Sequence, residues 1–308
     1  MQLSDVEDPT TTAFNVALEE RLSTTPPLRT LSAHDLQERR RLGSGLAEVT
    51  ESELATDRSI NGPAGPIPIR VLVPESVHGV YLHLHGGGWV AGSARLQDSL
   101  LEAIASTCSV AVVSVGYRLA PEHPFPSGPD DCEAAALWLV DRSRAEFGSD
   151  RLAIGGESAG AHLAALTLLR LRDRHDVRAF EAAVLSSGWF DLRLTPSARS
   201  WGERNLGLTT ADLRWLADQF LGGIDPGDAA VSPLCADLSS LPDALFTVGT
   251  LDPLLDDSVR MAERWRAAGG RAELAVYPGG VHSFHGYSLP LADAANARIH
   301  DFLSSRLS

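Results

Sequence analysis

Ser158 lies at the centre of a Gly-Glu-Ser-Ala-Gly segment, residues 156–160, where its hydroxyl could act as a nucleophile. The apolar residues 151–155 before it predict a buried strand, and the Leu/Ala-rich residues 161–174 after it predict a helix. A sharp strand-to-helix turn crowds the backbone, so it needs small residues two positions to either side of its centre, and the two glycines supply them. The turn would hold the hydroxyl above a sheet, with the Ala159 amide beside it to stabilise an oxyanion. An ordinary glycine-rich turn is the alternative.

Three consecutive glycines, Gly86 to Gly88, end an alternating stretch that starts at Tyr81. Consecutive glycines cost backbone entropy and contribute no packing, which indicates a need for bare amides. Acyl transfer has that need, because an oxyanion hole is built from unobstructed backbone N–H groups. A flexible loop and a phosphate cradle are the alternatives. No G-x-x-x-x-G-K-[ST] pattern follows, which disfavours the cradle.

Asp252 and His282 could complete a catalytic relay with Ser158. They follow it in the order serine, acid, histidine, and each comes after a strand-like run, residues 244–249 and 274–277. Parallel sheets present their functional residues on loops after strands. We therefore expect His282 to accept the serine proton as a general base, and Asp252 to orient its ring and stabilise the imidazolium.

Other acids and bases lie nearby in the sequence. Asp256 and Asp257 open a helical pattern over residues 258–268, so we interpret them as helix-capping or first-turn carboxylates and rank them below Asp252. His285 would be the fallback base.

His83 and His85 fall on one face of a predicted strand and could suggest a zinc pair. No further histidine or carboxylate stands at a recognised ligand spacing, so we expect no metal.

Together these motifs resemble the hormone-sensitive-lipase-like branch (bacterial family IV) of the α/β-hydrolases, which includes many bacterial carboxylesterases. The resemblance runs from about Ile67 to the C-terminus, and it departs from the family where Glu157 stands in place of the commoner Asp and Ser283 in place of Gly. The matching segments, in family order, are HGGGW (85–89), YRLAPEHPFP (117–126), GESAG (156–160), SPL (232–234), DPL (252–254) and the PGGVHSF segment that contains His282.

The resemblance implies an α/β-hydrolase fold, with a mainly parallel central sheet flanked by helices and covered by a helical cap. It implies that Gly87 and Gly88 donate to the oxyanion together with Ala159, and that His85 shapes the glycine loop. The implied activity is a serine carboxylesterase that hydrolyses small to medium acyl esters through an acyl-enzyme, without a cofactor. An amide or lactone hydrolase on the same machinery remains open. A non-catalytic small-molecule receptor is disfavoured, because such relatives lack the histidine that His282 provides.

The surrounding elements agree with an α/β class, because short Val/Ile/Leu runs alternate with helical segments. We expect strands near residues 67–73, 79–85, 109–115, 151–155, 182–187, 243–248 and 272–277.

The resemblance divides the chain into a catalytic core, residues 46–188 and 225–308, and two cap pieces, residues 1–45 and 189–224. Because the predicted strands begin after residue 45, we do not expect the first piece to be needed to build the catalytic residues. Its apolar face has two interpretations: it shields the core, or it closes the pocket together with residues 189–224, and we expect the second. The aromatic residues Trp89, Trp189 and Phe190 are expected to line an apolar pocket for substrate, together with others in the inserted piece: Trp201, Trp215 and Phe220.

Composition excludes several functions. All 26 basic residues are arginine, and without lysine the chain cannot be a Ser-x-x-Lys hydrolase, a Schiff-base enzyme or a P-loop nucleotidase. The net charge of −14 argues against nucleic acid or an anionic membrane as a partner. The expected partner is a small-molecule ester, and the resemblance makes a homodimer plausible.

Location is indicated only by what the sequence lacks. The first residues show no signal peptide, and no run of about 18 apolar residues predicts a membrane span. Cys108, Cys132 and Cys235 show no C-x-x-C spacing and are interpreted as small buried hydrophobic residues. We therefore expect a reduced, cytoplasmic protein.

Overall fold

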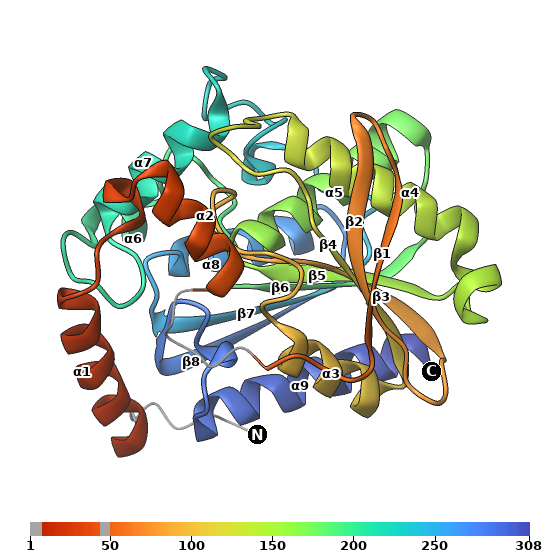
Figure 1. Ribbon diagram of the computed structural model, residues 1–308, viewed down its shortest axis with the longest axis horizontal. Helices are drawn as coiled ribbons and strands as arrows, with labels where there is room; N and C mark the ends of the chain where they lie inside the picture. Colours follow the sequence, from red (N-terminus) through yellow and green to blue (C-terminus); the bar gives the residue numbers. More distant parts are fainter. Residues whose placement is uncertain (1–7, 44–49) are drawn as a thin grey trace.

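The computed structural model describes residues 8–43 and 50–308 of the chain (Figure 1). The expected boundary between residues 45 and 46, and the start of the chain, lie outside the described residues. The strands are β1 (Ala55–Gly62), β2 (Gly65–Leu72), β3 (Gly79–Leu84), β4 (Val110–Val115), β5 (Leu152–Glu157), β6 (Phe180–Ser186), β7 (Asp243–Leu251) and β8 (Ala272–Val281). The α-helices are α1 (Pro9–Ser23), α2 (Ala33–Leu42), α3 (Asp98–Cys108), α4 (Ser127–Phe147), α5 (Ala159–His175), α6 (Pro196–Ser200), α7 (Thr210–Leu221), α8 (Leu255–Ala267) and α9 (Pro290–Leu307).

The described strands form one sheet in the order β1-β2-β4-β3-β5-β6-β7-β8. From β4 to β8 neighbouring strands are parallel, whereas β1 and β2 are antiparallel additions at one edge. The predicted mainly parallel α/β sheet is therefore confirmed. Strand β1 was not predicted, because its sequence ATDRSING is polar and poor in strand-forming residues. An edge strand with one solvated face tolerates such residues, and charged residues there discourage pairing with other chains.

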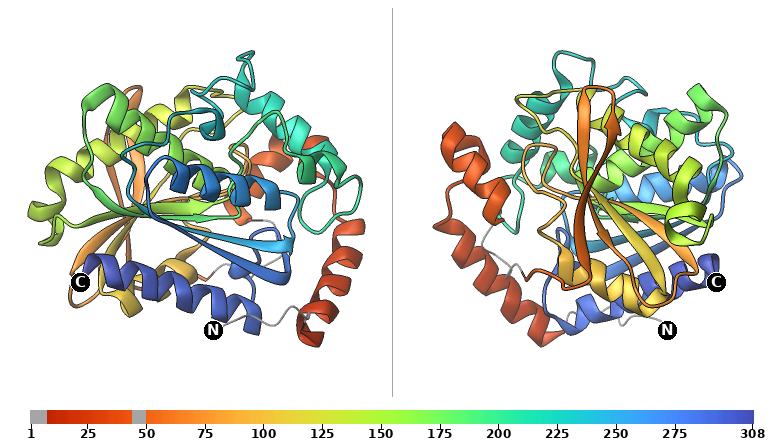
Figure 2. Two further views of the ribbon diagram at one scale, coloured as in Figure 1. Left: turned by 180° about the vertical axis from the view of Figure 1, so that it is seen from behind. Right: turned by 45° about the vertical axis from the view of Figure 1, so that its right-hand side comes forward.

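Helices cover both faces of the sheet (Figure 1). Helices α3 and α9 lie on one face and α4, α5 and α8 on the other. The apolar core of the α3/α9 face also takes in Leu18 and Leu22 of α1, whereas α7 contributes to the core of the opposite face. Figure 2 shows α1 beside the end of β8, so the N-terminal helix reaches the same edge of the sheet as the carboxyl ends of the parallel strands.

Two further expectations can be compared with the structure. No helix within residues 8–43 and 50–308 is long and apolar enough to cross a membrane. Cys108 and Cys132 are buried, as interpreted, whereas Cys235 is half-buried. Its sulfur lies 3.2 Å from the guanidinium of Arg193, so it is not a simple hydrophobic residue.

Candidate active site

Ser158 occupies the turn between β5 and α5 with φ 56° and ψ −118°, a conformation that a residue with a side chain rarely adopts. The flanking glycines explain how the turn fits. A Cβ atom on Gly156 or Gly160 would lie 2.0 or 1.8 Å from the carbonyl oxygen of Leu84 at the end of β3. No side chain fits at either position, so the glycines let the turn press against the neighbouring strand while Ser158 projects above the sheet.

The structure brings Ser158, His282 and Asp252 together from the ends of β5, β8 and β7. The Nε2 atom of His282 lies 2.9 Å from the Ser158 Oγ, and its Nδ1 lies 3.0 and 3.1 Å from the two carboxylate oxygens of Asp252. A carboxylate only accepts hydrogen bonds, so Nδ1 carries the proton and Nε2 is free to accept from the serine hydroxyl. Asp252 is buried, and the backbone amide of Leu254 also donates to it, which fixes its orientation. This geometry suits proton transfer from Ser158.

The glycine loop lies beside this serine, and its second and third amides are not bonded to the protein in the described ranges. Gly87 and Gly88 have φ values of 118° and 61°, and a Cβ on Gly87 would lie 2.2 Å from the carbonyl oxygen of Ala91. Within the described ranges, the amides of Gly87 and Gly88 donate to no protein acceptor. Ala159 begins α5, where an amide has no acceptor within its own helix. All three amides are therefore available to a bound oxyanion.

A cavity of about 370 Å³ opens onto these residues, and its lining is mainly apolar. Trp189 and Trp215 line it, as expected of the inserted piece. Trp89 and Phe190, which we also expected to contact substrate, are not among the residues that line it. The indole N–H of Trp89 donates to His162, and its ring stacks on Phe220 at 4.4 Å. The ring of Phe190 packs against that of Phe246. Trp201 is also absent from the lining of the cavity.

Sequence reasoning did not assign several aliphatic residues of the cavity wall. They come from both expected cap pieces and include Leu22, Pro26, Pro27, Leu28, Leu208 and Leu216. The Pro-Pro pair marks a break between two helical stretches, but no local pattern indicates that this break lies over the site.

Comparison with known proteins agrees with this arrangement. A family model described as alpha/beta hydrolase fold matches residues 81–286, two thirds of the chain. The chain belongs to the α/β-hydrolase family.

Among similar proteins of this family is the carboxylic ester hydrolase LipN of Mycobacterium tuberculosis, which is 36% identical over 241 residues. The match covers 74% of this chain and 64% of LipN, so the chain spans slightly less than two thirds of that relative. The carboxylesterase NlhH of the same organism is 36% identical over 75% of each chain.

Solved structures give the same family. A hyperthermophilic esterase from the archaeon Pyrobaculum calidifontis has a TM-score of 0.87 and 29% identity, with 97% of this chain and 99% of that one covered. A hormone-sensitive lipase from a metagenome library has a TM-score of 0.86 and 29% identity, with 97% and 98% covered. The expected fold and the hormone-sensitive-lipase-like branch of the α/β-hydrolases are thereby confirmed.

In this hydrolase the two histidines of the glycine-loop strand have separate partners. His83 lies 3.0 Å from the Ser114 hydroxyl and 3.1 Å from the Glu157 carboxylate. His85 donates from Nδ1 to the carbonyl of Gly86 at 2.8 Å and stacks on Tyr117. Burial lowers the pKa of His85 to about 4, so its ring is neutral and shapes the loop. Across the described part of the chain, no three His, Cys, Asp or Glu side chains gather as a metal site would require.

Glu157, directly before Ser158, connects the serine turn to the glycine loop. One carboxylate oxygen accepts the Gly86 amide and the other contacts His83. Burial acts to raise the pKa of Glu157, but the lowering interactions, led by His83 and including the hydrogen bond from the Gly86 amide, outweigh it, so the pKa is lowered and the group is ionised. Its position next to Ser158 was visible in the sequence, but its bond to the glycine loop was not.

His285, the fallback base, is buried and does not join the relay. Burial lowers the pKa of its imidazole, and its backbone carbonyl accepts a hydrogen bond from Asn296 of α9 at 2.9 Å. Its Nδ1 has no hydrogen-bond partner in the part of the chain that the structure describes.

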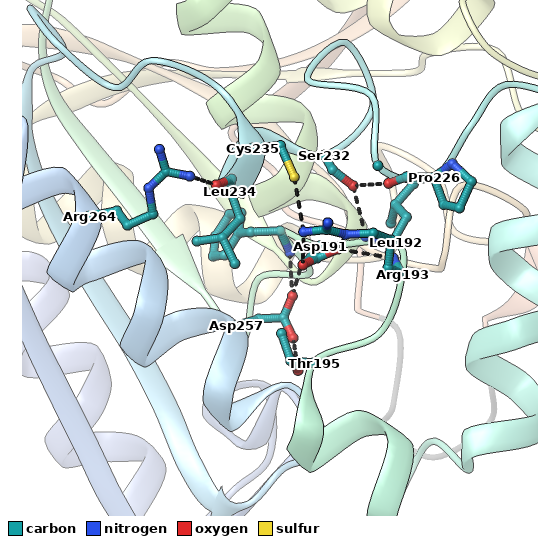
Figure 3. Close-up of polar contacts among 12 residues, drawn as sticks. Asp191, Leu192, Arg193, Thr195, Pro226, Ser232, Leu234, Cys235, Asp257 and Arg264 are labelled. Carbon is teal, nitrogen blue, oxygen red and sulfur yellow. Dashed lines mark hydrogen bonds and ion pairs between the residues drawn. The ribbon is translucent and has the colours of Figure 1, made fainter.

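Asp256 and Asp257 lie in the first turn of α8, as expected, but their carboxylates accept hydrogen bonds from the inserted piece and do not cap the helix. Figure 3 shows these contacts for Asp257. Asp257 accepts the amides of Phe190 and Asp191 at 2.8 and 2.9 Å and the hydroxyl of Thr195 at 2.6 Å. Burial raises the pKa of Asp257 to about 7.

Asp256 accepts the amide of Ser197 at 2.9 Å. Helix α8, which follows Asp252, therefore anchors the segment that follows Trp189.

Proposed function

We propose that this protein is a serine carboxylesterase that hydrolyses small to medium acyl esters through Ser158, His282 and Asp252. The observation that carries the proposal is the continuous hydrogen-bonded chain from the Asp252 carboxylate through His282 to the Ser158 hydroxyl, with contacts of 2.9 to 3.1 Å. This chain ends beside uncovered backbone amides at the mouth of an apolar cavity, which is the combination that acyl transfer requires. The names of the similar proteins support an ester as the substrate.

In the acylation step, His282 Nε2 takes the Ser158 proton while Oγ attacks the ester carbonyl carbon. The carbonyl oxygen becomes an oxyanion that accepts hydrogen bonds from the amides of Gly87, Gly88 and Ala159. The tetrahedral intermediate then collapses and expels the alcohol, which takes its proton from His282. Asp252 stabilises the imidazolium between these two transfers.

Deacylation repeats the sequence with water as the nucleophile. His282 removes a proton from water as the water attacks the acyl carbon, and the same amides hold the second oxyanion. Collapse releases the carboxylic acid and returns the proton to Ser158. The cycle consumes one water molecule and involves no oxidation or reduction, so its balance needs no cofactor.

Substrate size follows from the cavity and the two pieces that cover it. A space of about 370 Å³ accommodates a small or medium acyl chain, and its apolar wall favours hydrocarbon over charged groups. Leu28 from residues 1–45 and Leu216 from residues 189–224 both line this space, so we propose these two pieces as a shared cap over the core.

The proposal is tested by labelling and by hydrolysis. A fluorophosphonate should label the wild-type protein and leave Ser158→Ala unlabelled, and the wild type should hydrolyse p-nitrophenyl esters of short and medium chain. A receptor would bind small molecules without either reaction. A parallel panel of lactones and anilides distinguishes ester hydrolysis from lactone and amide hydrolysis. A higher kcat/KM on lactones or on anilides than on the esters would overturn the assignment to esters.

A further inference from the structure

The loop that carries His282 must be held in place, because a base displaced by about 1 Å loses much of its rate advantage. This loop leaves the sheet at the end of β8 and continues to the start of α9 at Pro290. Helix α1 lies next to the end of β8 in both views of Figure 2 and in Figure 1, although it precedes His282 by more than 250 residues in the sequence.

Asn15 of α1 bonds to the strand end that leads into this loop. Its side-chain amide donates to the carbonyl oxygen of Gly279 at 2.9 Å, and the residue is only 5% exposed. The N–H of Gly279 in turn donates to the Thr250 hydroxyl at 2.9 Å. Thr250 stands two residues before Asp252, so Gly279 is bonded both to α1 and to the segment that carries the catalytic acid.

Phe14 contacts the other side of the same loop. Its ring lies 4.9 Å from that of Tyr287, which follows His282 by five residues. Leu18 and Leu22, one and two turns further along α1, are buried in the same core cluster as Val281 and Phe284. Adjacent residues of one helix therefore contact both ends of the histidine loop.

We infer that α1 belongs to the scaffold of the catalytic centre and that Asn15 is a positioning residue for His282, an inference that rests on the function proposed above. This differs from the expectation that residues 1–45 only close the pocket. Asn15 touches neither the cavity nor the reacting atoms. It acts by fixing the backbone of Gly279, and through it the spacing between the loop of His282 and the loop of Asp252.

The experiment uses the full chain with Asn15→Leu, which keeps a similar size but removes the donor to Gly279. Its matched control is Val16→Ala, next to it on α1 with 56% of its surface exposed. A second control, Leu139→Ala, removes a buried side chain from α4 on the opposite face of the sheet and lowers stability without touching the loop. For each variant we would measure Tm, kcat and KM on one p-nitrophenyl ester, and the downfield proton resonance of the His282–Asp252 hydrogen bond.

Asn15→Leu should lower kcat by roughly tenfold to a hundredfold with KM changed less than about threefold, and should broaden or shift the downfield resonance. Both controls should keep the wild-type kcat and resonance at a temperature where they remain folded. If Asn15→Leu fails to fold, Thr250→Val tests the same residue through its N–H and should give the same loss of kcat. In a folded double variant the two losses should not add, because both bonds hold the backbone of the same residue, Gly279.

A wild-type kcat and resonance in folded Asn15→Leu or Thr250→Val would overturn the inference, as would a change confined to KM or acyl-length preference. Equal losses in Leu139→Ala would show a general effect of stability and would also overturn it. Ser158→Ala and His282→Ala, measured in parallel, separate this outcome from failure of the proposed function. If those two variants keep full activity, the catalytic assignment itself is wrong.

Discussion

The carboxylate of Glu157 accepts the backbone amide of Gly86, so the residue before Ser158 is bonded to the first residue of the glycine loop. The same carboxylate contacts His83 at 3.1 Å. Ser158 and the glycine loop come from neighbouring strands, and this side chain joins them.

Glu157→Ala should lower kcat by roughly tenfold to a hundredfold, because the glycine amides lose the anchor that orients them toward the oxyanion. Glu157→Gln is the matched variant, since its amide oxygen can still accept from Gly86. His83 can change tautomer to accept the new N–H, because the Ser114 hydroxyl both donates and accepts. We expect Glu157→Gln to retain kcat within a few-fold. Binding of a trifluoromethyl ketone, which forms a tetrahedral adduct, should weaken in the Ala variant in parallel with kcat. Unchanged kcat in folded Glu157→Ala would contradict this role.

Replacing Ser158, His282 or Asp252 with Ala should each lower kcat by several orders of magnitude, on the order of 10³ or more, because the three groups work as one unit. A variant with two of these substitutions should have a kcat only slightly below that of the less active single variant. Steady-state kinetics on a p-nitrophenyl ester, with circular dichroism to verify folding, measures this. His285→Ala is the control, and the assignment of the base fails if it abolishes activity while His282→Ala does not.

Leu216→Ala should shift the preferred acyl chain toward longer esters. Leu216 lines the cavity, and its side chain lies where a Cβ on Gly88 would be, so truncation enlarges the space beside the oxyanion loop. We expect the ratio of kcat/KM between a longer and a shorter ester to rise by roughly tenfold, the effect of about one or two methylene groups in an apolar pocket. Leu213→Ala, one turn earlier on α7, is buried but does not line the cavity. It should lower Tm and leave the ratio unchanged, and an equal shift in both variants would argue against a direct contact with substrate.

Asp257→Asn should flatten the dependence of stability on pH. The pKa of Asp257 is about 7 in the folded protein, above the ordinary value of about 3.9, so the folded state binds its proton more tightly. The favourable contribution of Asp257 to the free energy of unfolding is complete below about pH 4 and is lost as pH rises to about 7. Asparagine can still accept the amides of Phe190 and Asp191 and never ionises. The Tm of the variant minus the Tm of the wild type should therefore increase from about pH 4 to about pH 7. If the Tm of both proteins depends on pH in the same way, the raised pKa of Asp257 is contradicted.

Much of the catalytic centre could be predicted from the sequence because each part meets a local requirement. Gly156 and Gly160 stand where a strand-to-helix turn leaves no room for a side chain, and three glycines mark a loop of bare amides. The order of Ser158, Asp252 and His282 after strand-like runs predicted that parallel strands would bring them to one edge. The alternation of apolar runs and helical segments likewise predicted the sheet, with the polar edge strand β1 as the exception.

Only the tertiary structure decided how the site is supported and enclosed. Asn15 and Gly279 are 264 positions apart, and no local pattern relates a helix near the start of the chain to the strand end before His282. In the same way, Trp89 packs in the core, whereas Leu28 lines the cavity. By residue type alone, the aromatic Trp89 was the better candidate for a substrate contact. The type of a residue determines which chemistry its side chain can perform, and its neighbours in the sequence determine the local backbone structure. Which distant backbone groups it reaches depends on how helices and strands pack, and that packing is a property of the whole chain.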